Sequence, residues 1–286
     1  MKVSTTVIAL AMLIMLLALI AAGAGVLWKG SGESYEFTTL RGETVLIHGR
    51  GLYAFDTVSV VSQAIAQDVI TLAVGTPLLF LATILYRKAS LRGNLLLAGT
   101  LGYFLYTYAS YSFLSAFNSL FLLYVALFSL SLFAFVLTLM SIDVQSLPRH
   151  FSPGLPRTPI AALLFAVGAF LLVAWLGRII PALLDGSPPI GLESYSTLVI
   201  QVLDLGLVVP LTFLSGVLLL LQQPFGYLLT SVSLVKGFTL TIAVTAMVIG
   251  QLLAGVEVAL GEALIFPLLS LLVVGATVVL FRNVQE

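Results

Sequence analysis

Cysteine is absent from this chain, and charged residues are scarce. Without cysteine the protein can form no disulfide, no catalytic thiolate and no zinc or iron–sulfur site with cysteine ligands. Charged residues make up 8 % of the 286 residues, whereas a soluble domain carries about 25 %. Basic and acidic residues balance at 12 each, so no positive field favours a nucleic-acid partner.

Sequence motifs for nucleotide, metal and acyl chemistry are also missing. The chain contains no G-x-x-x-x-G-K-[ST], no H-E-x-x-H and no G-x-S-x-G. The two histidines, His48 and His150, lie in separate predicted loops and cannot jointly hold a metal or a haem. We therefore expect no cofactor and no metal, and we expect a protein that is not an enzyme.

Apolar residues dominate what is present. They make up 60 % of the chain, the mean hydropathy is +1.17, and apolar runs of membrane-spanning length recur along the sequence. In lipid every backbone polar group needs an internal partner, which leaves helices or a closed barrel. Barrel strands alternate apolar and polar residues, and these runs do not. The sequence therefore predicts an all-α, polytopic integral membrane bundle, a single membrane domain over residues 1–286.

Eight membrane-spanning helices are expected. The first could instead be a cleaved signal peptide, because Ala22-Gly23-Ala24 resembles a cleavage site, but its apolar stretch is longer than a usual signal core and we expect it to be retained. The expected spans are residues 7–28, 57–86, 94–115, 120–142, 159–176, 197–221, 226–253 and 263–281.

The segment 29–56 is the only sizeable polar stretch. Residues 36–40 and 43–48 are prone to form strands, and Arg41-Gly42 between them supplies turn chemistry. A small β-hairpin outside the membrane, between the first and second spans, is the expected structure.

Basic residues favour one orientation of the eight spans. Eight crossings put both termini on one side of the membrane, and the positive-inside rule makes the more basic side cytoplasmic. We expect cytoplasmic termini, an external hairpin and a location in a prokaryotic plasma (inner) membrane. Seven basic residues fall on the terminal side, Lys2, Arg87, Lys88, Arg92, Arg149, Arg157 and Arg282, and four on the other, Lys29, Arg41, Arg50 and Arg178.

An internal repeat is suggested at an offset of 133 residues. Pro77 aligns with Pro210, Phe80 with Phe213 and Gly93 with Gly226. Such a match would make spans two and three a parallel repeat of spans six and seven. Chance similarity between leucine-rich helices explains the match equally well. At this offset Asp204 takes the position of Thr71, Lys236 that of Tyr103 and Gln201 that of Asp68.

Two charged residues are expected at mid-membrane depth. Asp204 lies about 10 Å from the outer end of the sixth span and Lys236 about 15 Å from the inner end of the seventh. Because these helices are consecutive, the two side chains could form an ion pair. A charge at this depth costs about 2.5–3.5 kcal/mol, so such residues usually serve a function. The alternative is a structural pair that holds two helices in register.

Other polar residues could line the same site. Tyr103 and Thr107 belong to a polar stripe on the third span, and Asp68 and Gln201 lie near the outer mouths of the second and sixth spans. Hydrogen bonding between helices, or positions at headgroup level, would explain them as well. The candidate substrate-binding residues are Asp204, Lys236, Tyr103, Thr107, Gln201 and Asp68.

The leading functional hypothesis is a small permease or a membrane-embedded binding protein for a small solute, an ion or a proton. One alternative is a non-transporting partner subunit or scaffold that docks another membrane protein. A second alternative is a lipid-modifying enzyme of the outer leaflet that uses Asp56, Asp68 or Glu193, although the sequence offers it no nucleophile–base pair. The lipid bilayer is a partner in every case.

Overall fold

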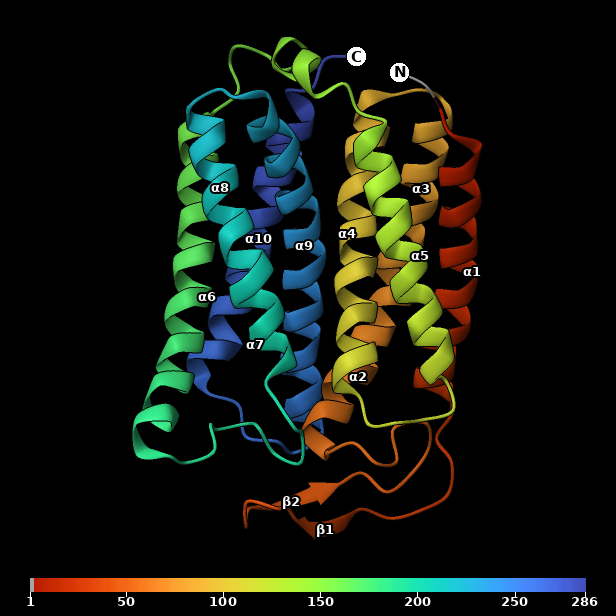
Figure 1. Ribbon diagram of the computed structural model, residues 1–286, viewed down its shortest axis with the longest axis vertical. Coiled ribbons are helices and arrows are strands. Elements are labelled where there is room, and N and C mark those ends of the chain that lie inside the picture. Colours follow the sequence, from red (N-terminus) through yellow and green to blue (C-terminus); the bar gives the residue numbers. More distant parts are fainter. Residues whose placement is uncertain (1–2) are drawn as a thin grey trace.

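The computed structural model describes residues 3–286, so Lys2 of the charge count lies outside the described residues. Long helices run side by side, and a small hairpin covers one end of the bundle (Figure 1). The elements are α1 (Thr5–Leu27), β1 (Tyr35–Thr38), β2 (Thr44–Ile47), α2 (Val58–Ile70), the π turn η1 (Thr71–Gly75), α3 (Thr76–Arg87), α4 (Leu91–Leu114), α5 (Phe121–Met140), the 3₁₀ segment η2 (Val144–His150), α6 (Arg157–Asp185), α7 (Val199–Leu203), the π turn η3 (Asp204–Val208), α8 (Val209–Leu220), α9 (Pro224–Leu253) and α10 (Leu260–Arg282).

The helices are those of a multi-pass membrane protein. Seven helical segments of the described chain are long and apolar enough to cross a membrane, among them Val58–Arg87 and Val199–Leu220, which run through the π turns. The 24-residue α4 is not one of the seven, because it carries the polar and tyrosine residues of the expected third span. It nevertheless lies within the bundle, and both termini end opposite the hairpin (Figure 1).

The bundle consists of two halves that meet where α9 packs against α2 and α4. We call α1–α5 the first half and α6–α10 the second half. One cluster of buried apolar side chains lies in the first half, and the other lies mainly in the second half and includes Leu95 and Ala98 of α4. At their junction a Cβ on Gly99 of α4 would overlap the side chain of Val235 of α9, and one on Gly102 would lie 3.9 Å from Val232 Cγ1. These glycines allow the two central helices to approach closely.

The same backbone features occur 133 residues apart. The π turn at Thr71–Gly75 corresponds to that at Asp204–Val208. Ala89 and Gln222 both have positive φ, at 56° and 54°. A Cβ on Gly93 would lie 2.6 Å from the Tyr86 nitrogen, and one on Gly226 would lie 2.5 Å from the Leu219 nitrogen. The tight turn between the second and third helix of each half is therefore built in the same way.

The expected hairpin is confirmed. Tyr35 pairs with Ile47 and Thr38 with Thr44 in an antiparallel register, and Gly42 takes a φ of 85° in the turn. Arg41, in the turn of the hairpin, donates a hydrogen bond through Nη1 to the Tyr195 carbonyl at 3.3 Å. The hairpin is thus attached to the linker that precedes α7.

The prediction was wrong at the end of the fifth span. Helix α6 runs to Asp185, so Pro181 lies inside the helix and not in a linker. A proline inside a helix removes one backbone hydrogen bond, and its ring crowds the carbonyl of the preceding turn, but α6 continues past it to Asp185. The helix ends at Gly186, whose φ of 68° closes it in the left-handed conformation that glycine favours.

Candidate functional site

An elongated cavity of about 350 Å³ lies between the two halves. Helices α2 and α4 of the first half form one wall, and α6, α8, α9 and α10 of the second half form the others. Along α9 its lining runs from Ser233 to Gln251, which is about 27 Å at 1.5 Å per residue. The cavity therefore extends from the middle of the bundle to its hairpin end.

Lys236 lies near the inner part of this cavity. Its residue is only 7 % exposed, and its ammonium group has no hydrogen-bond partner among the described residues. Nζ lies 3.9 Å from the centroid of the Tyr106 ring, over its face. This cation–π contact compensates part of the lost hydration but leaves all three N–H donors unused.

Asp204 faces the same cavity with its acceptors occupied. It begins the π turn η3 and is 4 % exposed. The Tyr106 hydroxyl donates to Oδ1 at 2.7 Å, and the Trp175 indole N–H donates to Oδ2 at 2.9 Å. Asp204 and Lys236 therefore do not form the expected hydrogen-bonded ion pair, because Tyr106 lies between them and contacts both.

The other candidate residues divide between the cavity and its surroundings. Thr107 lines the cavity, as Asp204 and Lys236 do. Gln201 lines a separate pocket beneath the linker that precedes α7. Tyr103 and Asp68 lie in the first half, behind the cavity wall. There Gln67 donates to Tyr103 Oη at 2.7 Å, and Tyr111 donates to Asp68 Oδ1 at 2.9 Å.

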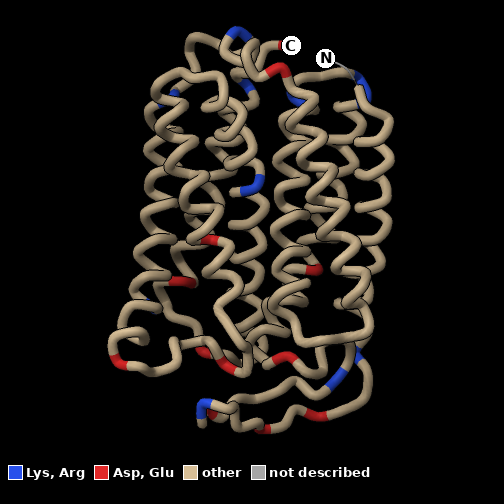
Figure 2. The backbone as a smooth tube through the Cα atoms, in the orientation of Figure 1, with Lys and Arg blue, Asp and Glu red and all other residues tan. Residues whose placement is uncertain are grey.

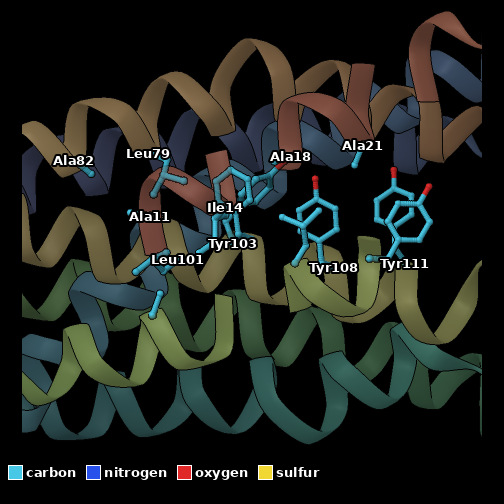
Figure 3. Packing of buried hydrophobic residues seen from close by; sticks show 14 of the residues in the cluster. Ala11, Ile14, Ala18, Ala21, Leu79, Ala82, Leu101, Tyr103, Tyr108 and Tyr111 are labelled. Atoms are coloured by element: carbon cyan, nitrogen blue, oxygen red, sulfur yellow. The ribbon is translucent and has the colours of Figure 1, made fainter. Parts of the chain in front are cut away.

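The first half is filled where the second half is hollow. Tyr103, Tyr108 and Tyr111 point from α4 toward α1, whose facing positions Ala11, Ala18 and Ala21 are small (Figure 3). Phe104 joins them with no exposed surface. The tyrosines of the expected polar stripe therefore serve mainly as core residues.

Two site residues were missed at the sequence level as partners of Asp204. Neither Tyr106 nor Trp175 is among the candidate residues predicted from the sequence. Trp175 could have been identified from the sequence, because an indole N–H within an apolar helix usually has a hydrogen-bond acceptor nearby. Of the carboxylates in the helices of the second half, Asp204 is the one that lies inside an apolar run, whereas Asp185 and Glu262 lie at helix ends.

A second polar cluster connects the loops at the hairpin end. The Asp56 Oδ1 atom accepts the Ala116 N–H and the Tyr195 hydroxyl, each at 2.8 Å. The Thr57 hydroxyl donates to Glu193. Burial raises the pKa of Asp56 to about 6 and also raises the pKa of Glu193. These contacts fix the linker before α7 to the start of α2.

Charged residues gather at the two ends of the bundle, and few lie between them (Figure 2). Among residues 3–286 no group of three or more His, Cys, Asp or Glu side chains could hold a metal ion. No family model, curated protein or solved structure matches this chain.

Proposed function

We propose that this protein is a permease or membrane-embedded binding protein for a small solute, with Lys236 and Asp204 at its site. The observation that carries the proposal is the buried ammonium group of Lys236, which has no hydrogen-bond partner in the described chain and belongs to a residue that lines a cavity. Buried charges are normally paired, because an unpaired one loses its hydration without compensation. A bound solute with an acceptor group would supply the missing partner.

The orientation belongs to the proposal as well. The loops at the terminal end carry Arg87, Lys88, Arg92 and Arg149, which the positive-inside rule assigns to the cytoplasm. We place the hairpin outside and the chain in a prokaryotic plasma membrane. The cavity, which reaches the hairpin end, then opens toward the exterior.

Two related halves are a further part of the proposal. The paired π turns, the positive-φ residues and the tight-turn glycines support an internal repeat at an offset of 133 residues. The repeat would place the site on one side of a pseudo-twofold axis along the membrane normal, where α4 meets α9.

The alternative functions have less support. For a lipid-modifying enzyme, Asp56 and Asp68 lie in separate clusters, and both carboxylates are hydrogen-bonded to tyrosine hydroxyls. For a scaffold, the described residues offer an exposed hairpin but no feature that selects a partner.

Accessibility of position 236 tests the proposal. Because the chain has no cysteine, Lys236→Cys creates a single thiol. We expect a small positively charged thiol reagent added outside intact cells to modify it. The matched control is Val235→Cys, whose side chain packs against Gly99 and is fully buried, and which should stay unreactive.

A folded Lys236→Cys protein that resists the reagent would contradict the proposal and indicate a dry contact between helices. In that case the structural alternative predicts that replacing Asp204 and Lys236 together by apolar residues preserves the fold. The proposed function predicts instead that Lys236→Met folds and loses solute binding.

A further inference from the structure

We propose that the cavity binds an elongated aliphatic carboxylate, with its carboxylate at Lys236 and its hydrocarbon chain directed along α9 toward the hairpin end. This inference rests on the proposed binding function and specifies the class of ligand. Three observations support it: the free donors of Lys236, the length and lining of the cavity, and the residues that the first half carries in its place.

The head group follows from the donors and acceptors at the inner part of the cavity. Lys236 offers an unpartnered ammonium, whereas both Asp204 oxygens already accept a hydrogen bond, from Tyr106 and Trp175. The site therefore lacks a hydrogen-bond acceptor for Lys236. An anionic acceptor forms the stronger, charge-assisted hydrogen bond with an ammonium group. A carboxylate meets this need with one group.

The body of the ligand follows from the rest of the cavity. Between Lys236 and the hairpin end the second half presents mainly apolar side chains. They include Val167, Phe170, Leu240, Val244, Met247 and Phe266. A cavity about 27 Å long with a volume of about 350 Å³ is narrow, and it fits a chain better than a compact solute. An amino acid or an inorganic anion would leave most of this apolar surface without contact.

A comparison of the two halves explains why the space exists. Tyr103, Phe104, Tyr108 and Tyr111 fill the core of the first half. At the offset of 133 their positions in the second half are occupied by Lys236, Gly237, Thr241 and Val244, all of which line the cavity. Four aromatic rings are thus replaced by one long cation and three smaller side chains. The second half therefore lacks the rings that fill the corresponding space of the first half, and the cavity between the halves extends into that space.

The outer helices of the two halves also differ in how closely they pack against each other. Helices α1 and α5 pack against each other along the first half, whereas α6 and α10 make little contact. Both α6 and α10 line the cavity, so their weakly closed seam faces the lipid beside it. A hydrocarbon chain can pass through such a seam without entering water.

Quenching of a single tryptophan tests the inference. Trp28 and Trp175 are the only tryptophans, so Trp28→Phe leaves Trp175 at the cavity wall as the sole reporter. In that background the purified protein is titrated with bromodecanoate and, separately, with the bromodecanol of the same chain length. We expect bromodecanoate to half-quench Trp175 at a concentration about tenfold or more below that of the alcohol.

Two variants separate the head group from the chain. Lys236→Met should remove the preference for the carboxylate and make the two compounds equal, which also controls for unspecific partition into detergent. Val244→Tyr introduces the residue that the first half carries at the equivalent position and leaves Lys236 in place. It should weaken quenching by both compounds, and it keeps the test informative if Lys236→Met fails to fold.

Equal quenching by both compounds in the protein with Lys236 would overturn the inference. If neither compound quenches but leucine or inorganic phosphate shifts the Trp175 emission, the ligand class is wrong while the proposed binding function stands. If none of these compounds acts and Lys236→Cys is also unreactive, both proposals fail. Displacement of bromodecanoate by anionic phospholipid vesicles at equal potency would assign the site to a lipid phosphate and overturn the carboxylate.

Discussion

Tyr106 holds two buried charges apart. Its ring lies 3.9 Å from Lys236 Nζ and its hydroxyl donates to Asp204 at 2.7 Å, so one side chain contacts both. A direct ion pair would consume the donors of Lys236 and leave nothing for a ligand. Because the Tyr106 ring lies between the two side chains, the ammonium group of Lys236 remains available to a ligand.

Removal of the Tyr106 hydroxyl should be measurable. Tyr106→Phe leaves the ring over Lys236 but deprives Asp204 of one of its two donors. We expect a loss of about 1–3 kcal/mol in the free energy of unfolding, because a buried carboxylate oxygen becomes unsatisfied. Denaturant unfolding of the purified protein measures this.

Tyr108→Phe is the matched control, because the Tyr108 ring is buried but its hydroxyl makes no hydrogen bond to a described residue. Its unfolding free energy should change by less than about 0.5 kcal/mol. Equal effects of the two substitutions would mean that the hydrogen bond to Asp204 contributes nothing to stability.

The sequence could identify the two charges but not their geometry. Asp204 and Lys236 are recognisable because they are charges inside apolar runs. Their separation depends on rotation about the helix axes, and the π turn that begins at Asp204 changes this rotation. Each added residue turns a helix by about 100° at 3.6 residues per turn. The depth of a residue along its helix does not determine this rotation.

At the scale of elements, the π turns inside two spans are the main feature that the sequence did not reveal. The second and sixth spans were expected as continuous helices, and each contains a π turn before a proline. Pro77 and Pro210 lack an N–H, so the helix before them must adjust. Prolines indicate where such a change occurs, but they do not show which form it takes. The hairpin and the span boundaries followed from composition and turn residues, except for the end of the fifth span, where α6 continues to Asp185.

The tight-turn glycines should be equally intolerant of substitution. Gly93→Ala and Gly226→Ala each place a methyl group against the backbone of the preceding helix. We expect each to cost about 1–3 kcal/mol through overpacking. Thermal unfolding in detergent compares them. Gly275→Ala is the control, since nothing lies within 4 Å of its added Cβ, and it should be neutral or slightly stabilising.

If one of the two tight-turn variants is tolerated and the other is not, the two turns are not equivalent. That result would weaken the internal repeat and, with it, the comparison of aromatic and cavity-lining positions.

The linker before α7 should respond to pH. Burial raises the pKa of Asp56 from 3.8 to about 6, so the folded protein keeps a proton that the unfolded chain has lost. Stability is therefore highest below the lower of these values and falls as the pH rises through the higher one. We expect a loss of about 1–3 kcal/mol over that range.

Asp56→Asn keeps the oxygen that accepts from Ala116 and Tyr195 but cannot titrate. The decrease of its thermal midpoint between pH 4 and pH 7 should be smaller than that of the unmodified protein. Identical pH profiles would show that Asp56 does not control this change.

At the scale of the whole molecule, the two ends of the bundle differ both in structure and in the number of basic residues. The hairpin lies at one end, and both termini lie at the other with most of the basic loops (Figures 1 and 2). The composition sufficed to predict a multi-pass helical bundle. The position of the cavity between the halves could not be predicted, because it depends on how residues far apart in the sequence pack together.

The orientation can be tested with single cysteines in this cysteine-free chain. Glu36→Cys lies on β1 and Lys88→Cys lies between α3 and α4, and both positions are exposed. A membrane-impermeant maleimide added to intact cells should label only the Glu36→Cys protein. After permeabilisation both should react, which controls for expression. Labelling of Lys88→Cys in intact cells would reverse the orientation.

The filled tyrosine core limits how the protein could work as a carrier. A transporter whose halves exchange roles during its cycle requires a comparable opening in each. In this structure aromatic rings occupy that space in the first half. For the proposed permease we therefore expect the rearrangement that moves the solute to occur in the helices around Lys236, with the tyrosine-filled half as the support.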